Sequence, residues 1–338
     1  MEYMGKRWLF VCSNSRYNSC YEDLEKSFEG KEDYRRYEFF GGISSISEIK
    51  KMQDIVETNK IDVVVAVGGG SAVDAAKATA YYMGKRIVII PTVAATDAPC
   101  TGLSVIYNDD GSFNKYLFYP QNPDAVLVDS SVIAKAPVKF LIAGMGDTLG
   151  TYFEGRASLR TESPSMESGG ITRAGMSIAK TCYETLRKYG KAVITACENN
   201  VVTPALDAII EATVYLSGVG ADNVNCAAPH SFYNGVTSLG GHEAYHGNCV
   251  EFGTLIQLTL ECADKAEFED IQNFCLEVGL PITLSEPGNF TDEEIRIISK
   301  NACVKGETIH NLAGDVTPDE LYAAIIATDA LGRARLGK

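Results

Sequence analysis

The fold of this chain is decided by residues 63–97, VVVAVGGGSAVDAAKATAYYMGKRIVIIPTVAATD. A buried-strand pattern ends in Gly68, Gly69 and Gly70, a helix pattern follows, and a second strand pattern leads to Asp97. Glycines allow a tight turn and let backbone N–H groups approach a diphosphate closely, and the N-terminus of a helix attracts anions. The segment therefore predicts a strand, a turn and a helix that together bind a nucleotide.

The glycine run alone is a weak signal. It lacks the G-x-G-x-x-G spacing of the strict dinucleotide fingerprint, and tight strand-to-helix turns are common in α/β proteins. Ser71 and Asp74 also resemble a helix-capping pair, which would explain part of the motif by helix initiation. The nucleotide-binding interpretation therefore depends on the rest of the chain.

Length and composition predict a globular protein of two domains. The chain has 338 residues, of which 46% are hydrophobic and 22% charged, as in ordinary globular proteins. A net charge of −14 without a basic stripe argues against binding nucleic acid or an anionic membrane surface. The apolar runs are too short to cross a bilayer and the start resembles no secretory signal, so we expect a cytoplasmic protein. Ten cysteines without C-x-x-C pairs predict reduced thiols.

The pattern of elements changes near Pro137. Before it, strand and helix patterns alternate, which predicts an α/β dinucleotide-binding domain of residues 1–137, with a parallel sheet and helices on both faces. Asn-Asp-Asp-Gly at 108–111 separates two β-prone runs and predicts a hairpin. After it, long helical patterns predict an all-helical metal- and substrate-binding domain of residues 138–338.

The distribution of histidines indicates a metal site. The chain has four, and His230, His242 and His246 fall within seventeen residues. Neutral imidazole is a favoured ligand of zinc and related ions. In one interpretation HEAYH, which ends at His246, is the H-E-x-x-H helix of a zinc metallopeptidase, although flanking glycines weaken such a helix. In another, two histidines and Asp147 bind the ion, unless Asp147 only caps a helix.

A resemblance favours the second interpretation. The chain resembles glycerol dehydrogenases and their relatives in the metal-dependent, iron-type alcohol dehydrogenase superfamily in the ordered segments GGGSAVDAAK, PTVAATDAPCTGLSVIYNDDG, NPDAVLVD, APVKFLIAGMGDTLGTYFE, HSFYNG and HGNCVEFGTL. The match covers nearly the whole chain and is most specific at residues 91–107 and 140–154. It implies a dehydroquinate synthase-like fold, a homo-oligomer, and hydride transfer between NAD or NADP and a small polyol or hydroxy compound.

The resemblance also implies site residues. A divalent metal, Zn²⁺ or Fe²⁺, would be bound by Asp147, His230 and His246, which leaves coordination sites open for a substrate. Asp97 would hydrogen-bond a second substrate hydroxyl and favour vicinal diols, and His242 would relay a proton outward. The dinucleotide would lie along the glycine turn and contact Gly70, Ser71, Asp74, Thr92, Ala95, Thr101, Leu103 and Tyr107.

The chain departs from the family in two places. Where relatives carry an aspartate for the adenosine ribose, this chain reads VCSNSRYNS, so Ser13, Ser15 and Arg16 are candidates to bind the 2′-phosphate of NADP. Phe232 and Tyr233 stand where glycerol-specific members carry a further histidine, which would reshape the substrate pocket.

Other functions remain open at this point. A polyol-phosphate dehydrogenase of the glycerol-1-phosphate type, or a cyclase of the dehydroquinate synthase kind, needs cationic phosphate ligands, and lysine and arginine are sparse around Asp97, Asp147 and His230. The metallopeptidase predicts a metal at His242 and His246 without a dinucleotide. A dinucleotide-binding sensor predicts cofactor binding without metal or turnover.

Overall fold

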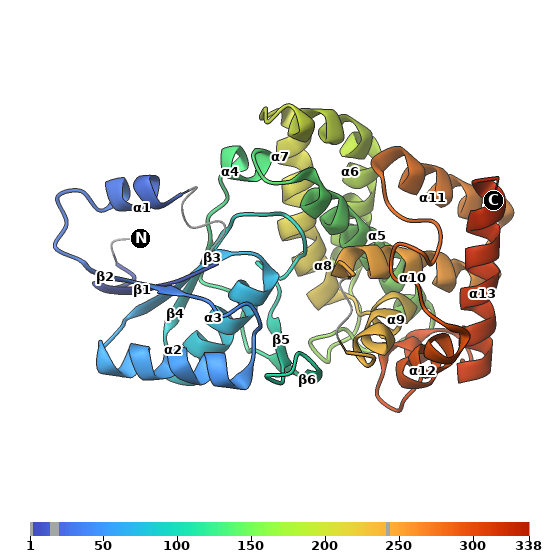
Figure 1. Ribbon diagram of the computed structural model, residues 1–338, viewed down its shortest axis with the longest axis horizontal. Coiled ribbons are helices and arrows are strands. Elements are labelled where there is room, and N and C mark those ends of the chain that lie inside the picture. Colours follow the sequence, from blue (N-terminus) through green and yellow to red (C-terminus); the bar gives the residue numbers. More distant parts are fainter. Residues whose placement is uncertain (1–2, 14–19, 241–243, 338) are drawn as a thin grey trace.

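The computed structural model describes residues 3–13, 20–240 and 244–337, and it joins a sheet-containing part to a helical part (Figure 1). This confirms the predicted order of an α/β region followed by a helical region. No helix in these described ranges combines the length and apolar character needed to cross a membrane.

The main sheet has five parallel strands in the order β2-β1-β3-β4-β7. They are β1 (Arg7–Cys12), β2 (Tyr34–Phe39), β3 (Val63–Gly68), β4 (Arg86–Pro91) and β7 (Ala125–Val126). Helices α2 (Ile46–Thr58) and α3 (Gly70–Met83) cover one face and α1 (Tyr21–Ser27) lies over the other, as Figure 1 shows. Because both faces are covered, β3 is apolar along its whole length and every one of its residues is buried.

The strand order predicts where this sheet would bind a ligand. Connections leave in opposite directions from β1 and β3, and ligands of such sheets bind beyond the carboxyl ends of the strands at that switch point. The N–H of Ser13, just past β1, donates to the carbonyl oxygen of Val67 at 3.0 Å. The end of β1 therefore lies directly beside the glycine turn that follows β3.

A hairpin of β5 (Leu103–Tyr107) and β6 (Phe113–Phe118) confirms the turn predicted at Asn-Asp-Asp-Gly. The N–H of Asn108 donates to the carbonyl oxygen of Ser112 at 2.8 Å, and Gly111 takes a positive φ of 86°. In Figure 1 the hairpin lies between the sheet and the helical part. It reaches the latter through the Tyr116 hydroxyl, which donates to Asn234 Oδ1 at 2.8 Å.

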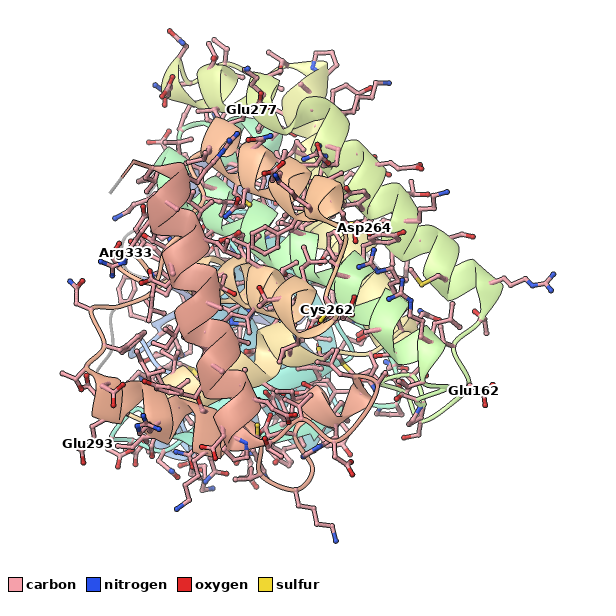
Figure 2. All side chains as sticks on the ribbon, turned by 90° about the vertical axis from the view of Figure 1, so that its right-hand side faces the viewer. Glu162, Cys262, Asp264, Glu277, Glu293 and Arg333 are labelled. Carbon is pink, nitrogen blue, oxygen red and sulfur yellow. The ribbon has the colours of Figure 1, made fainter. Side chains whose placement is uncertain are left out.

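The helical part packs around α5 (Val138–Arg160) and α10 (His246–Leu260), whose inner residues share one large core with their neighbours. Figure 2 views this part from its outer side, with α13 in front and Glu162, Glu277 and Glu293 at the rim. The other elements are α4 (Ser130–Ala134), α6 (Arg173–Glu198), α7 (Pro204–Ile210), the π-helix η2 (Glu211–Leu216), α8 (Ser217–Asn223), α9 (Ala228–Thr237), α11 (Lys265–Val278), α12 (Asp292–Ala302), the 3₁₀ helix η3 (Thr308–Asn311) and α13 (Pro318–Arg335).

All ten cysteines fall within the described residues, and none of them forms a disulfide. Eight are buried, as expected for thiols that pack as small hydrophobic side chains. The predicted reduced state is therefore consistent with the fold.

Candidate functional site

Three side chains from three helices converge at the inner end of the helical part. Asp147 lies in the middle of α5, His230 in the first turn of α9, and His246 is the first residue of α10. Their candidate ligand atoms all lie within 4.8 Å of one another. His246 Nε2 is 3.1 Å and His230 Nε2 is 3.7 Å from Asp147 Oδ1. Asp147 is therefore not a helix cap, because nine residues of α5 precede it.

Glycines bring these helices into backbone contact. A Cβ atom at Gly247 would lie 1.7 Å from the Ala143 carbonyl oxygen, and one at Gly146 would lie 2.3 Å from the Gly247 carbonyl oxygen. Gly253 of α10 packs against α9 in the same way, because a Cβ atom at Gly253 would lie 2.6 Å from the Cα atom of Pro229. Only glycine permits such approaches. The short distances between helix axes allow one carboxylate to meet two imidazoles.

The electrostatics of the cluster are those of a buried anion facing two imidazoles. The Asp147 side chain is 1% exposed, and the side chains of His230 and His246 are 21% and 25% exposed. Burial by itself would raise the pKa of Asp147, but the charge and hydrogen bond of His246 and the charge of His230 hold that pKa below its ordinary value. The N–H of Asp97 donates to Asp147 Oδ2 at 3.3 Å.

This donor set fits a divalent metal. One carboxylate and two imidazoles, with no lysine or arginine among the recorded ion pairs of Asp147 in the described chain, match the ligands that zinc and iron prefer. A second cluster, Glu154, Cys226 and His230, shares the histidine through its other nitrogen. It is a poorer metal site because burial raises the pKa of Cys226 to about 11, which keeps the thiol protonated.

A cavity of about 500 Å³ opens in front of the histidines and extends to the glycine turn. Its lining includes Asp97, whose Oδ2 accepts a hydrogen bond from Ser217 at 3.1 Å. Burial and the neighbouring Asp147 carboxylate raise the pKa of Asp97 to about 8. The cavity therefore brings the substrate aspartate implied by the resemblance close to the candidate metal ligands.

The glycine turn at the opposite end of the cavity fits a phosphate. Helix α3 begins after Gly69 without a side-chain cap, so the amides of its first turn are available to an anion. The Ser13 and Thr92 hydroxyl oxygens, beside this turn, are buried without a hydrogen-bond partner among the described residues. A Cβ at Gly70 would lie 3.1 Å from Thr96 Oγ1, which shows how little space a side chain would have.

The capping pair expected at Ser71 and Asp74 is wrong. Asp74 instead accepts the N–H of Val105 at 3.2 Å and lies 3.4 Å from Lys77 Nζ. Lys77, only 2% exposed, donates to the carbonyl oxygens of Ala98 and Leu103 and to Thr101. Burial raises the pKa of Asp74 and lowers that of Lys77, and the ion pair opposes both shifts. Lys77 therefore anchors the loop that lines the cavity, which sequence reasoning missed.

Most of the predicted cofactor residues lie at this cavity. Its lining includes Gly70, Ser71, Asp74, Thr101, Leu103 and Tyr107. Gly68 and Gly69 form the turn itself, Thr92 is buried immediately after β4, and Ala95 lies partly buried in the loop that follows. Their contacts with a dinucleotide remain predictions.

Some predicted residues cannot be placed, and one motif fails. His242, Ser15 and Arg16 lie outside the described residues. The metallopeptidase interpretation requires one helix through HEAYH, but Ala244 and Tyr245 precede α10, which begins at His246. That interpretation is therefore wrong.

Sequence reasoning also missed polar side chains around the metal cluster. Glu154 binds the ring of His230, and Ser217 links Asp97 to Thr151, whose hydroxyl lies 2.8 Å from that of Ser217. Glu154 was detectable, because it follows Asp147 by seven residues and so shares its helix face. Ser217 was not, since it lies directly after a π-helix that periodicity does not reveal.

Comparisons with known proteins agree with this architecture. The family model for iron-containing alcohol dehydrogenases matches residues 1–130. The chain is 43% identical to the glycerol dehydrogenase of Escherichia coli O6:H1 over 98% of this chain and 91% of that protein. It is 41% identical to the glycolaldehyde reductase of Halobacterium salinarum over 87% of this chain and 81% of that protein. The crystal structure of a probable glycerol dehydrogenase from Sinorhizobium meliloti 1021 superposes with a TM-score of 0.92 at 37% identity, over 98% and 92% of the two chains.

The chain therefore belongs to the iron-containing alcohol dehydrogenase family. Within that family, it groups with the glycerol dehydrogenases, as the resemblance implied.

Proposed function

We propose that this protein transfers a hydride between a nicotinamide dinucleotide and a small, neutral polyol or its ketone, in the manner of a glycerol dehydrogenase. The observation that carries the proposal is the convergence of Asp147, His230 and His246 at a cavity that also reaches the uncapped start of α3. Membership in a family of metal-dependent polyol oxidoreductases supports it.

Each end of the cavity has a distinct task. A divalent ion held by Asp147, His230 and His246 would supply a Lewis acid that polarises the oxygen of a substrate hydroxyl or carbonyl group. A dinucleotide along the glycine turn would supply or accept the hydride. The amides at the start of α3 bind and orient the diphosphate, and Asp97, steadied by Ser217, accepts a hydrogen bond from a second substrate hydroxyl. This arrangement favours vicinal diols over simple alcohols.

The absence of cationic side chains from the described cavity lining disfavours phosphorylated substrates. No lysine or arginine belongs to its lining in the described parts of the chain, whereas Asp74, Asp97 and Glu307 do. A lining without lysine or arginine among its described residues offers no cationic partner to the phosphate of a substrate. The polyol-phosphate dehydrogenase and the phosphate-eliminating cyclase are therefore disfavoured. The 41% identity to a glycolaldehyde reductase supports hydroxy-aldehydes as additional substrates.

The finer assignments are part of the proposal. Zinc or ferrous iron suits the donor set, and NADP is accepted beside NAD because Ser13 follows β1 where an aspartate would repel the 2′-phosphate. His242 relays the substrate proton to solvent. The boundary between the dinucleotide-binding domain and the helical domain lies near residue 137. The protein assembles as a homo-oligomer.

The decisive experiment follows NADH and NADPH absorbance with glycerol, 1,2-propanediol, dihydroxyacetone, glycolaldehyde and glycerol 1-phosphate, with and without a chelator. We expect chelator-sensitive turnover of the neutral compounds, lost in His230→Ala. His310→Ala is the matched control, because His310 is exposed on η3 and outside the cavity. Turnover that resists chelation, a preference for the phosphate, or the absence of dinucleotide binding would overturn the proposal.

A further inference from the structure

Glu154 is a buried carboxylate whose partners all belong to the segment that carries His230. It lies on α5 two helical turns after Asp147, and its side chain is 1% exposed. Its Oε2 is 2.8 Å and its Oε1 3.1 Å from Nδ1 of His230. No lysine or arginine neutralises it in the hydrogen bonds and ion pairs of the described chain. The carboxylate depends on these partners, because burial of an unpaired carboxylate is costly.

The carboxylate also holds the backbone at the start of α9. Glu154 Oε1 accepts the N–H of Ala227 at 2.7 Å and the N–H of His230 at 3.3 Å. Ala227, the residue before the helix, has no side chain able to cap it, and Pro229 has no N–H to bond. A negative charge at a helix N-terminus is stabilising. One side chain thus anchors both the main chain and the imidazole of His230.

These contacts determine which nitrogen of His230 carries the proton. A carboxylate only accepts hydrogen bonds, so Nδ1 carries a proton that it donates to Glu154. When Nε2 binds a metal, the ring is therefore the neutral tautomer with its proton on Nδ1. Nε2 is the nitrogen that faces Asp147 Oδ1 at 3.7 Å and that shares the cluster with His246. Glu154 therefore accepts a hydrogen bond from one edge of the imidazole, and Asp147, the other acidic residue of α5, faces the opposite edge.

We propose that Glu154 is a positioning residue that holds His230 in the tautomer and orientation needed to bind the metal. The proposal rests on the proposed function in one respect, namely that Asp147, His230 and His246 are the ligands. Carboxylate partners of this kind orient the imidazole and raise its basicity, and their loss lowers metal affinity by about 10- to 100-fold.

The test measures metal affinity rather than turnover. Glu154→Gln keeps the shape of the side chain, but it loses the charge and places an N–H group where Nδ1–H or a backbone N–H now donates. Metal-free wild type and variant are titrated with Zn²⁺ against a competing chelator, and with Co²⁺ while its visible ligand-field absorption is recorded. We expect Glu154→Gln to bind Zn²⁺ about 10- to 100-fold more weakly and to alter the Co²⁺ band.

Two further variants separate the possible failures. Glu251→Gln is the matched control, because Glu251 is an equally buried glutamate of α10 whose recorded hydrogen bond comes from the Cys275 thiol. Its metal affinity should equal that of the wild type. Asp147→Asn tests the ligand set itself: unchanged Zn²⁺ affinity there would refute the proposed metal site.

The positioning role is overturned by a single pattern of results. If Asp147→Asn lowers Zn²⁺ affinity while Glu154→Gln matches the wild type in both affinity and Co²⁺ spectrum, the metal site stands and Glu154 has no part in it. Thermal unfolding and NADH binding of each variant show whether it folds. If Glu154→Gln does not fold, Glu154→Asp takes its place, because it keeps the charge on a shorter side chain and should weaken Zn²⁺ binding less than removal of the charge.

Discussion

The two ends of the cavity are built in different ways. The nucleotide end comes from a short stretch of chain, where β3, the glycine turn and the start of α3 follow one another and present mainly backbone groups. The metal end collects Asp147, His230 and His246 from three helices, and it presents side chains alone. The nucleotide end should tolerate replacement of a side chain but not added side-chain volume at the glycine turn. The metal end depends on each individual side chain and on the glycines that bring the helices together.

The contrast predicts that damage at one end leaves the other intact. His246→Ala should have the largest effect: it removes a ligand without disturbing a helix, because His246 is the first residue of α10. We expect kcat/KM for glycerol to fall by about 10³-fold, or about 4 kcal/mol. NADH affinity, measured by fluorescence titration, should stay within about twofold of the wild type. A large loss of NADH binding would show that the two ends are not independent.

Lys77→Met tests how far the nucleotide end depends on a buried charge. Without Lys77, the buried Asp74 loses its cation and the carbonyl oxygens of the cavity loop lose their donor. We expect the free energy of unfolding to fall by about 3 to 5 kcal/mol, measured by denaturant titration.

The matched control for this change is Lys180→Met. Lys180 forms an exposed pair with Glu184 on α6, so its loss should cost no more than about 0.5 kcal/mol. Equal losses in the two variants would mean that the buried ion pair has no special role.

Gly70→Val tests the space at the glycine turn. The branched side chain would enter the gap in front of Thr96, where the diphosphate is expected. The dissociation constant for NADH should rise roughly 10- to 100-fold, equivalent to about 1.4 to 2.7 kcal/mol, while Zn²⁺ affinity stays that of the wild type. Gly70→Ala should give a smaller effect in the same direction. Unchanged NADH binding in both variants would place the dinucleotide elsewhere.

Glu251 is a buried carboxylate of the helical part that pairs with a thiol, that of Cys275, and not with a histidine as Asp147 and Glu154 do. Burial raises its pKa well above the ordinary value, against the opposing hydrogen bond from Cys275. Between the unfolded-state pKa and this higher folded-state pKa, the folded protein holds one more proton than the unfolded chain. Its stability therefore falls as pH rises through that interval, by up to about 1.4 kcal/mol per pH unit from this group.

Glu251→Gln removes this titration and keeps the shape of the side chain. Denaturant unfolding of both proteins between about pH 5 and pH 8 should show the stability of the variant gaining on that of the wild type as pH rises. A constant difference across this range would mean that Glu251 titrates normally in the fold.

Several features could be predicted from local sequence. Strands β3 and β4, helix α3 and the hairpin of β5 and β6 were expected near their observed positions, because burial patterns and turn residues act over short distances. Helix α9 was missed because its ten residues, APHSFYNGVT, are poor helix formers, so tertiary contacts determine it. The capping role of Ser71 was wrong for a related reason: Asp74 finds a buried lysine that local spacing does not suggest.

The amino-acid sequence by itself determined the class of fold, the glycine turn and, through resemblance, the identity of the three candidate metal ligands. Only the tertiary structure decided that Glu154 binds the ring of His230 and that Ser217 binds Asp97. It also decided that no lysine or arginine of the described chain lines the cavity in front of the histidines. The physical reason is the separation along the sequence over which the deciding interactions act. Backbone elements follow from neighbouring residues, whereas the orientation of an imidazole depends on groups that are far apart in sequence and meet only when the helices pack.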